Sequence, residues 1–117
     1  MRIEGPALLA RIYIGESDRW EGRPLYQVIV EKLRAEGVAG ATVLRGIEGY
    51  GRAARVHTAQ VLRLSEDLPV LIEVVDREDR LRSVLPQIDA MVDGGLITLE
   101  HVEVIAYRSP EPDGEAT

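Results

Sequence analysis

Three arginines and a histidine lie close together in a stretch of the chain that contains no acidic residue. Arg52, Arg55 and Arg63, with His57, fall between residues 50 and 64 of a chain whose formal net charge is −6. A guanidinium group binds phosphate or carboxylate groups through paired hydrogen bonds. The run therefore indicates recognition of a small anion. The alternative is a solvated loop whose arginines balance neighbouring acids.

Glycines precede this run and favour the same chemistry. Gly46, Gly49 and Gly51 allow close backbone approach and positive φ, which a loop that cradles phosphate needs. They match neither the dinucleotide-binding fingerprint nor the P-loop. A turn at the end of a strand would use the same glycines, so both interpretations stay open.

Other kinds of site have little support in the sequence. His57 and His101 are the only histidines and the chain has no cysteine, whereas metal sites usually need three or four ligands. Glu100 and Glu103 flank His101 and keep a metal site as an alternative. No serine has a histidine partner that the sequence signals, so we expect no catalytic residues, no resident metal and no enzyme activity.

Composition limits the class of protein. With 117 residues, 45% of them hydrophobic and 29% charged, the chain is expected to form one globular domain over residues 1–109, followed by a disordered acidic tail over 110–117. An acidic balance of 14 basic to 20 acidic residues argues against nucleic acid as a partner. The sequence shows no membrane span and no signal peptide, so we expect a cytoplasmic protein without direct membrane insertion.

Hydrophobic periodicity predicts four strands and two helices. The strands are expected over residues 7–14, 40–47, 69–75 and 96–107, the last with a bulge or a bend at Glu100-His101. One helix should begin at Pro24 and stop at Glu36-Gly37. The second should begin after Asp76 as N-cap, with a kink or break in front of Pro86.

The order of these elements defines the fold class. A β-α-β-β-α-β order predicts an α+β, ferredoxin-like fold, in which a four-stranded antiparallel sheet carries both helices on one face. Leu9, Tyr13, Leu71 and Val75 would then be apolar residues on the other face. We therefore predict an obligate homo-oligomer that covers this second face, and a pairing of Arg11 with Glu73 across adjacent central strands.

Several runs of sequence resemble the PII signal-transduction proteins. The run GVAGATV at residues 37–43 and the run GIEGYGR at 46–52 are similar to the second strand and loop entry of that superfamily. The runs LPVLIEVVD, DGG and VEVIAYR follow in the same order. Within the superfamily, the chain is identified as a member of the PII-like family catalogued as domain of unknown function one hundred and ninety.

This resemblance implies a homotrimer that binds a small anionic ligand, with an adenine nucleotide as the candidate, in clefts between subunits. It needs no resident cofactor. Thr42, Gly51 and Arg52 align with PII positions that contact nucleotide, Arg108 matches one of two arginines of the last strand, and Gly49 belongs to the same glycine-rich loop entry. The connection over residues 49–67 corresponds to the T-loop, which reports occupancy to a partner.

For that partner contact the predicted residues are Arg55, His57 and Arg63, and the candidate client is a membrane transporter or channel. Three alternatives stay open. One is a trimer that responds to divalent metal, as in the divalent-cation tolerance proteins. Another is a trimer that only binds protein, without a ligand. The last is a small enzyme on the same scaffold.

Overall fold

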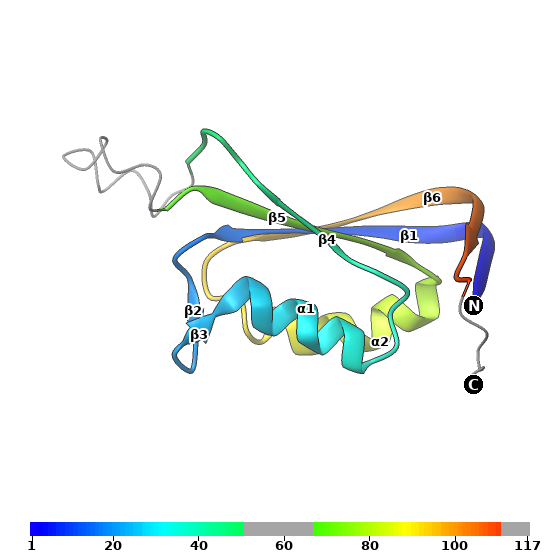
Figure 1. Ribbon diagram of the computed structural model, residues 1–117, viewed down its shortest axis with the longest axis horizontal. Coiled ribbons are helices and arrows are strands. Elements are labelled where there is room, and N and C mark those ends of the chain that lie inside the picture. Colours follow the sequence, from blue (N-terminus) through cyan, green and yellow to red (C-terminus); the bar gives the residue numbers. More distant parts are fainter. Residues whose placement is uncertain (51–66, 111–117) are drawn as a thin grey trace.

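A four-stranded antiparallel sheet forms one layer of the protein and two helices form the other (Figure 1). The computed structural model describes residues 1–50 and 67–110. The main sheet contains β1 (Arg2–Gly15), β4 (Thr42–Arg45), β5 (Pro69–Asp76) and β6 (Leu96–Arg108) in the order β4-β5-β1-β6. The helices are α1 (Leu25–Ala35) and α2 (Glu78–Asp89). The predicted ferredoxin-like order is confirmed.

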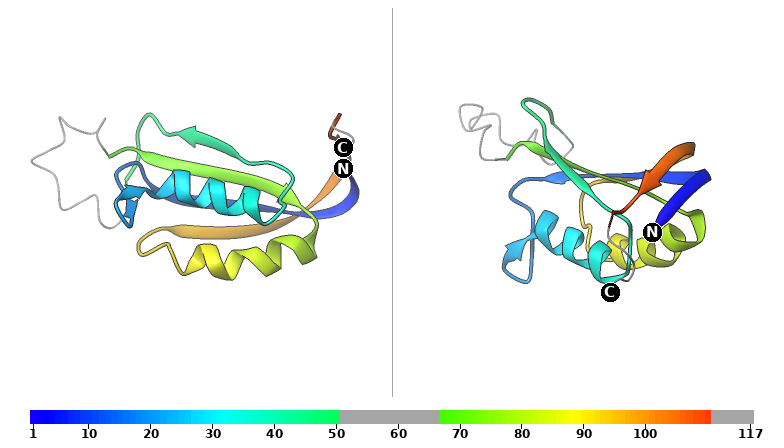
Figure 2. Two further views of the ribbon diagram at one scale, coloured as in Figure 1. Left: turned by 60° about the horizontal axis from the view of Figure 1, so that its bottom comes forward. Right: turned by 45° about the vertical axis from the view of Figure 1, so that its right-hand side comes forward.

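Both helices pack on one face of the sheet, with α1 and α2 side by side beneath it (Figures 1 and 2). Each helix buries one apolar stripe, which includes Ile29 and Leu33 on α1 and Leu81 and Ile88 on α2. Alternate residues of the central strands β1 and β5 meet these stripes. They are Leu8, Ala10, Ile12 and Ile14 on β1 and Val70, Ile72 and Val74 on β5.

Helix α1 ends where the sequence predicts, because Gly37 adopts the left-handed conformation at φ 84°. The Gly37 amide donates to the Arg34 carbonyl and the Val38 amide donates to the Leu33 carbonyl, at 3.1 and 3.0 Å. This pattern satisfies the last carbonyls of the helix, and the buried Val38 adds an apolar contact. At the other end Pro24 is the N-cap, so the helix begins one residue later than predicted.

The predicted loop before α1 contains a small two-stranded ribbon, β2 (Arg19–Trp20) and β3 (Arg23–Pro24). The turn of this ribbon holds Glu21 and Gly22 at positive φ. Strand β1 begins at Arg2, five residues ahead of the prediction, because its first residues pair with the end of β6. The prediction missed both features, since neither has a regular apolar alternation.

One further prediction is wrong, and the predicted break before Pro86 and bulge at Glu100-His101 do not occur. Asp76 is not the N-cap of α2; Arg77 is, without a side-chain cap, and Asp76 is instead fully buried at the end of β5. The helix runs through Pro86 without a break. The register of β6 with β1 is regular at Glu100 and His101, and the irregularity lies between Ile3 and Gly5. The bulge was predicted from a shift in the alternation of apolar residues along β6. An edge strand need not alternate in burial, so this shift does not mark a bulge.

Asp76 ties three segments together at the end of β5 opposite Pro69. Its carboxylate accepts hydrogen bonds from the amides of Ala39 and Arg77, at 2.8 and 2.6 Å, and lies 3.5 Å from the Arg80 guanidinium. The Tyr107 hydroxyl donates to the Ala39 carbonyl at 3.1 Å. The connection from α1 to β4 is therefore held between β5, α2 and β6.

Candidate functional site

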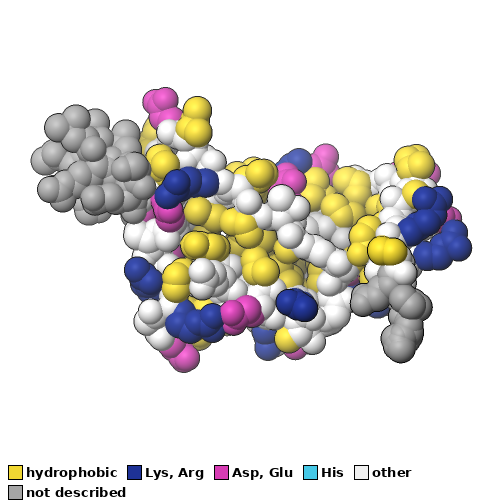
Figure 3. All heavy atoms as spheres, in the orientation of Figure 1, with side chains coloured by type: hydrophobic (Ala, Val, Ile, Leu, Met, Phe, Trp, Pro, Cys, Tyr) yellow, Lys and Arg dark blue, Asp and Glu magenta, His cyan; other side chains and the backbone are white. Residues whose placement is uncertain are grey.

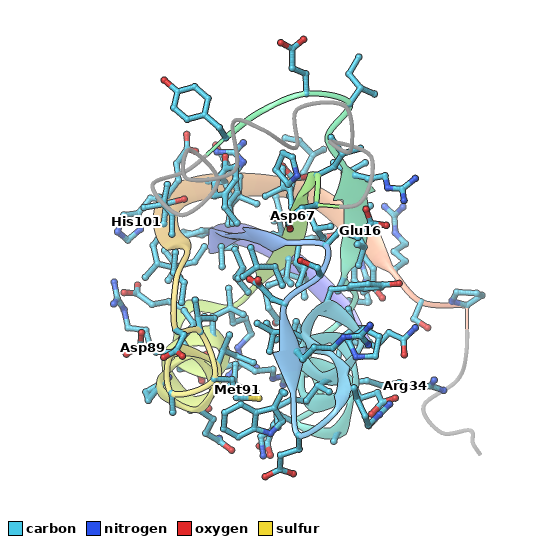
Figure 4. The ribbon with its side chains drawn as sticks, turned by 90° about the vertical axis from the view of Figure 1, so that its left-hand side faces the viewer. Glu16, Arg34, Asp67, Asp89, Met91 and His101 are labelled. Carbon is cyan, nitrogen blue, oxygen red and sulfur yellow. The ribbon has the colours of Figure 1, made fainter. Side chains whose placement is uncertain are left out.

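A cavity of about 1080 Å³ opens at the end of the sheet where the chain leaves the described residues at Tyr50 and returns at Asp67. Figure 4 looks onto this end, with Asp67 at the level of the sheet and Met91 in the helix layer. The cavity lies between the ribbon β2–β3, the ends of β1 and β5, and the connection from α2 to β6. Its volume is slightly above the usual range of about 300–1,000 Å³ for small-molecule sites.

The floor of the cavity is built around Gly15 at the end of β1. The Gly15 amide donates to the carboxylate of Asp18 at 2.9 Å, and the Ser17 hydroxyl donates to that of Asp67 at 2.8 Å. A Cβ at Gly15 would meet an oxygen of Asp67 at 3.0 Å and one of Asp18 at 3.2 Å. Gly15 is thus the residue that allows both carboxylates to approach the strand end.

The glycines of the loop entry are explained by Pro69. A Cβ would come within 2.8 Å of Pro69 Cγ at Gly46 and within 2.9 Å at Gly49. The Gly46 amide donates to the Pro69 carbonyl at 2.7 Å. These two glycines let the chain pack against the start of β5 as it leaves β4, which is the turn interpretation of the sequence. Gly49 also lines the cavity.

Beside this entry, Arg45 at the end of β4 forms an ion pair with Glu16. The hydrogen bond to Glu16 holds the pKa of the Arg45 guanidinium above its ordinary value. The second carboxylate oxygen of Glu16, Oε1, is buried without a hydrogen-bond donor among the described residues. The pair joins the end of β1 to the end of β4 at the mouth of the connection.

The described lining of the cavity is acidic and aromatic. Asp18, Asp67 and Asp93 contribute carboxylates, and Arg19 is the only cation among the described residues that line it. Aromatic rings come from three residues that are at least a third exposed: Tyr13, Trp20 and Tyr50. Carboxylates accept hydrogen bonds, so these residues suit hydroxyl or amine groups rather than phosphate.

The predicted ligand residues are spread over the molecule. Of the three that the structure describes, only Gly49 lines the cavity; Thr42 is exposed at the start of β4, opposite Glu73. Arg108 is the last residue of β6, which forms the edge of the sheet opposite to β4, and it pairs with Arg2 of β1. Since β6 has 13 residues, Arg108 lies about 40 Å along the strand from Leu96 at the cavity. One copy of the chain cannot bring Gly49 and Arg108 together.

Five predicted residues lie outside the described part of the chain. They are Gly51 and Arg52 of the ligand set and Arg55, His57 and Arg63 of the partner-binding set. The two ends of their segment, Tyr50 and Asp67, both line the cavity. The predicted acidic tail lies outside the described residues from 111 onward.

The histidine that the structure describes is not part of a metal site there. His101 is exposed on the edge strand β6, and Figure 4 shows it at the side of the molecule, away from Asp67. The carboxylate of the neighbouring Glu100 contacts Arg11, 3.2 Å away, on the opposite face of the sheet. Within residues 1–50 and 67–110, no three histidine or acidic side chains gather closely enough to hold a metal ion.

Sequence reasoning missed Asp18 and Asp67, which it treated as loop residues. A signal was available, because β1 and β5 are antiparallel and Gly15 pairs with Pro69. The residues just after β1 and just before β5 must therefore be neighbours.

None of the helices in the described part of the chain has the length and hydrophobicity that crossing a bilayer requires.

The fold is that of the PII-like proteins. A PII-like signalling protein of Thermus thermophilus has a TM-score of 0.61 at 18% identity, over 95% of this chain and 94% of that one. CPII from Thiomonas intermedia K12, a nitrogen regulatory PII-like protein, has a TM-score of 0.56 at 14% identity, over 92% and 100%. Its structure bound to ADP, AMP and acetate has a TM-score of 0.55 at 17% identity, over 91% and 92%.

The sequence comparisons identify the family within this fold class. The profile of DUF190, described as "Uncharacterized ACR", matches residues 7–104. A UPF0166 protein of Aquifex aeolicus is 39% identical over 105 residues, which cover 90% of this chain and 98% of that protein. UPF0166 protein MJ1524 of Methanocaldococcus jannaschii is 40% identical over 84% of this chain and 91% of that protein. The chain belongs to the DUF190 family, as its sequence predicts.

Proposed function

We propose that this chain is a non-catalytic, PII-like regulatory protein that assembles as a homotrimer and binds a small anionic ligand between its subunits. An adenine nucleotide is the proposed ligand, and residues 49–67 are the segment that contacts a partner protein. A membrane transporter or channel is the proposed client, and the cytoplasm the proposed location. Residues 1–109 act as one domain in this proposal.

The separation of the predicted ligand residues carries this proposal. Gly49 and Thr42 are associated with the edge strand β4, and Arg108 ends the opposite edge strand β6. Two copies that place the β4 edge of one near the end of β6 of the other would complete the site. The structure of CPII bound to ADP and AMP supports the choice of a nucleotide.

The chemistry divides between the two kinds of residue. Arg52 and Arg108 supply the positive charge that phosphate needs, through charge-assisted hydrogen bonds. The carboxylates of Asp18, Asp67 and Asp93 accept hydrogen bonds from ribose hydroxyls or from an exocyclic amine. The three carboxylates repel inorganic phosphate, which offers them no neutral hydroxyl or amine group to bind. The proposed site therefore prefers a nucleoside phosphate to inorganic phosphate.

Thermal unfolding of the purified oligomer in the presence of ATP, ADP, AMP, 2-oxoglutarate, bicarbonate and divalent metals tests the proposal. A ligand at one hundred times its Kd adds about 2.7 kcal/mol of stability, which shifts Tm visibly. Arg52→Ala should weaken nucleotide binding by about 1.5–3 kcal/mol, the range for a charge-assisted hydrogen bond. Arg34→Ala is the matched control, since Arg34 is exposed near the end of α1 and does not line the cavity.

Mixing two variants tests whether the site lies between copies. Arg52→Ala and Arg108→Ala chains should each bind nucleotide poorly alone. Refolded together, they should regain part of the binding, because some clefts then combine an intact Arg52 with an intact Arg108. Failure of the mixture to regain binding would place both residues in one copy or outside the site. No response to any ligand would indicate a trimer that only binds protein.

A further inference from the structure

The beginning of β1 and the end of β6 form a two-stranded arm at one end of the molecule (Figure 1). Strand β5 pairs with β1 only from Leu8 onward, so residues 2–7 of β1 pair with β6 alone. Figure 3 shows Lys and Arg side chains gathered at this end. The arm therefore presents positive charge on a part of the sheet that has only two strands.

Two arginines face each other at the tip of the arm. Arg2 of β1 and Arg108 of β6 are direct partners in the register, and such partners lie on one face with Cβ atoms about 4.5–5.5 Å apart. The next pair, Ile3 and Tyr107, lies on the other face, since Ile3 is buried and Tyr107 contacts the Ala39 carbonyl. The two arginines are both exposed and start from neighbouring positions on the outer face, which points away from the helices.

The charge of this pair is only partly balanced. Like charges directly opposite each other on two strands are destabilising. Arg2 contacts the carboxylate of Glu4 at 3.3 Å, with side chains that are 69% and 50% exposed. Among the described residues, no acidic side chain pairs with Arg108. An anion bound by both guanidinium groups would remove their repulsion, and the exposed pair of Arg2 with Glu4 is weak enough to be displaced.

Hydrogen bonds on both sides of Arg108 hold the tip of the arm in place. The Tyr107 hydroxyl donates to the Ala39 carbonyl at 3.1 Å, and the Ser109 amide donates to the Met1 carbonyl at 3.0 Å. The backbone positions that carry the two arginines are therefore fixed by the fold itself. A ligand that binds them has less ordering to do, which favours binding.

We propose that Arg2 is a further phosphate-binding residue beside Arg108, and that this pair selects ligands with two or more consecutive phosphate groups. One guanidinium fork binds one phosphate group through paired hydrogen bonds, so two forks on partnered residues fit a diphosphate. Glu4 competes with the ligand for Arg2. The assignment rests on the proposed function, from which the nucleotide and the role of Arg108 come.

Isothermal titration calorimetry of the purified oligomer with ADP, AMP and pyrophosphate tests the role of Arg2. Arg2→Ala should weaken binding of ADP and pyrophosphate at least ~10-fold and binding of AMP much less, because AMP has no second phosphate group. Arg2→Lys keeps the charge without the fork and should also bind ADP more weakly than the wild type.

Arg77→Ala is the matched control for Arg2→Ala. Arg77 also pairs with an acid two residues further along the chain, Asp79, at 2.6 Å, and both side chains are exposed. Arg77 precedes α2 and lies outside the arm, so its replacement should leave all three affinities unchanged.

Glu4→Gln changes the affinity in the opposite direction. The variant removes the competing carboxylate and should bind ADP and pyrophosphate about 2–5-fold more tightly than the wild type, the range for loss of an exposed ion pair. A gain in affinity cannot come from damage to the fold. Circular dichroism and a cooperative urea transition establish that each variant is folded.

Different results overturn this assignment and the proposed function. Unchanged ADP affinity in Arg2→Ala would exclude Arg2 from the site, and equal losses for ADP and AMP would show that it binds no second phosphate group. Wild-type ADP affinity in Arg2→Lys would show that charge alone is sufficient, and unchanged affinity in Glu4→Gln would show that Glu4 does not compete. A wild type that binds pyrophosphate through Arg2 but binds no nucleotide would refute the proposed nucleotide and leave the paired site standing.

Discussion

Replacing Asp76 by Ala removes the one fully buried charged residue among those that the structure describes. Its carboxylate accepts two backbone hydrogen bonds, from Ala39 at 2.8 Å and Arg77 at 2.6 Å, and pairs with Arg80 at 3.5 Å. The substitution leaves the Ala39 amide without its acceptor, and leaves Arg80 without its counter-charge. The connection that leads into Thr42 then loses its attachment to β5.

The size of the effect follows from these contacts. A hydrogen bond to a charged group contributes about 1.5–3 kcal/mol, and removing one partner of a buried pair costs about 3–5 kcal/mol. Asp76→Ala should therefore lower the free energy of unfolding by about 3–5 kcal/mol, a large part of the roughly 5–15 kcal/mol of a typical domain. Asp76→Asn keeps one acceptor oxygen and should lose about half as much.

Urea denaturation followed by circular dichroism measures this difference, at one protein concentration for all variants, because assembly adds to apparent stability. Asp79→Asn is the matched control, since Asp79 lies three residues away with a side chain that is 68% exposed. Its effect should be much smaller. If Asp76→Ala loses less than about 1 kcal/mol, the buried carboxylate does not stabilise this junction and the reasoning is wrong.

Two further predictions concern other parts of the fold. Gly95→Ala should lower the free energy of unfolding by about 1–3 kcal/mol in the same assay, because the added Cβ would lie 2.5 Å from the Tyr13 carbonyl oxygen. Gly94→Ala is the control, since a Cβ at Gly94 meets nothing within 4 Å. Equal losses of stability in the two variants would contradict this prediction. The hydrogen bond from Arg23 lowers the pKa of Glu31 below its ordinary value of 4.5, so the pair stabilises the fold above that pH and this stability is lost as the pH falls through the lowered pKa. Glu31→Gln should therefore lose less stability than the wild type between pH 7 and pH 3, and identical acid transitions would show that the pair makes no contribution.

Hydrophobic periodicity was sufficient to predict most of the elements. The stripe that includes Ile29 and Leu33 defines α1, and Gly37 ends it through a positive φ that the residue type itself signals. In the run Pro69–Asp76 every second residue is apolar and faces the helices, and some of the residues between them are apolar as well. This pattern predicted a central strand. The Arg11–Glu73 pair was also predictable, because both residues lie mid-strand on the outer face, and the structure confirms it.

Errors arose where a residue's neighbours come from distant parts of the chain. Asp76 has the residue type and position of an N-cap, yet it is buried because the connection from α1 to β4 packs against it. The alternation of apolar residues along β6 changes phase at Glu100, which suggested a bulge there. The pairing of β6 with β1 instead places the irregularity in register between Ile3 and Gly5. Local patterns do not contain this information, since long-range packing overrides local preference.

By itself, the sequence determined the fold class, the family and the presence of an arginine-rich run at Arg52, Arg55 and Arg63, because residue types and their periodicity are local properties. Tertiary structure decided the location of the cavity, where the antiparallel pairing of β1 with β5 brings Asp18 beside Asp67. It also decided that Gly49 and Arg108 lie at opposite edges and ends of the sheet, a separation fixed by the strand order β4-β5-β1-β6.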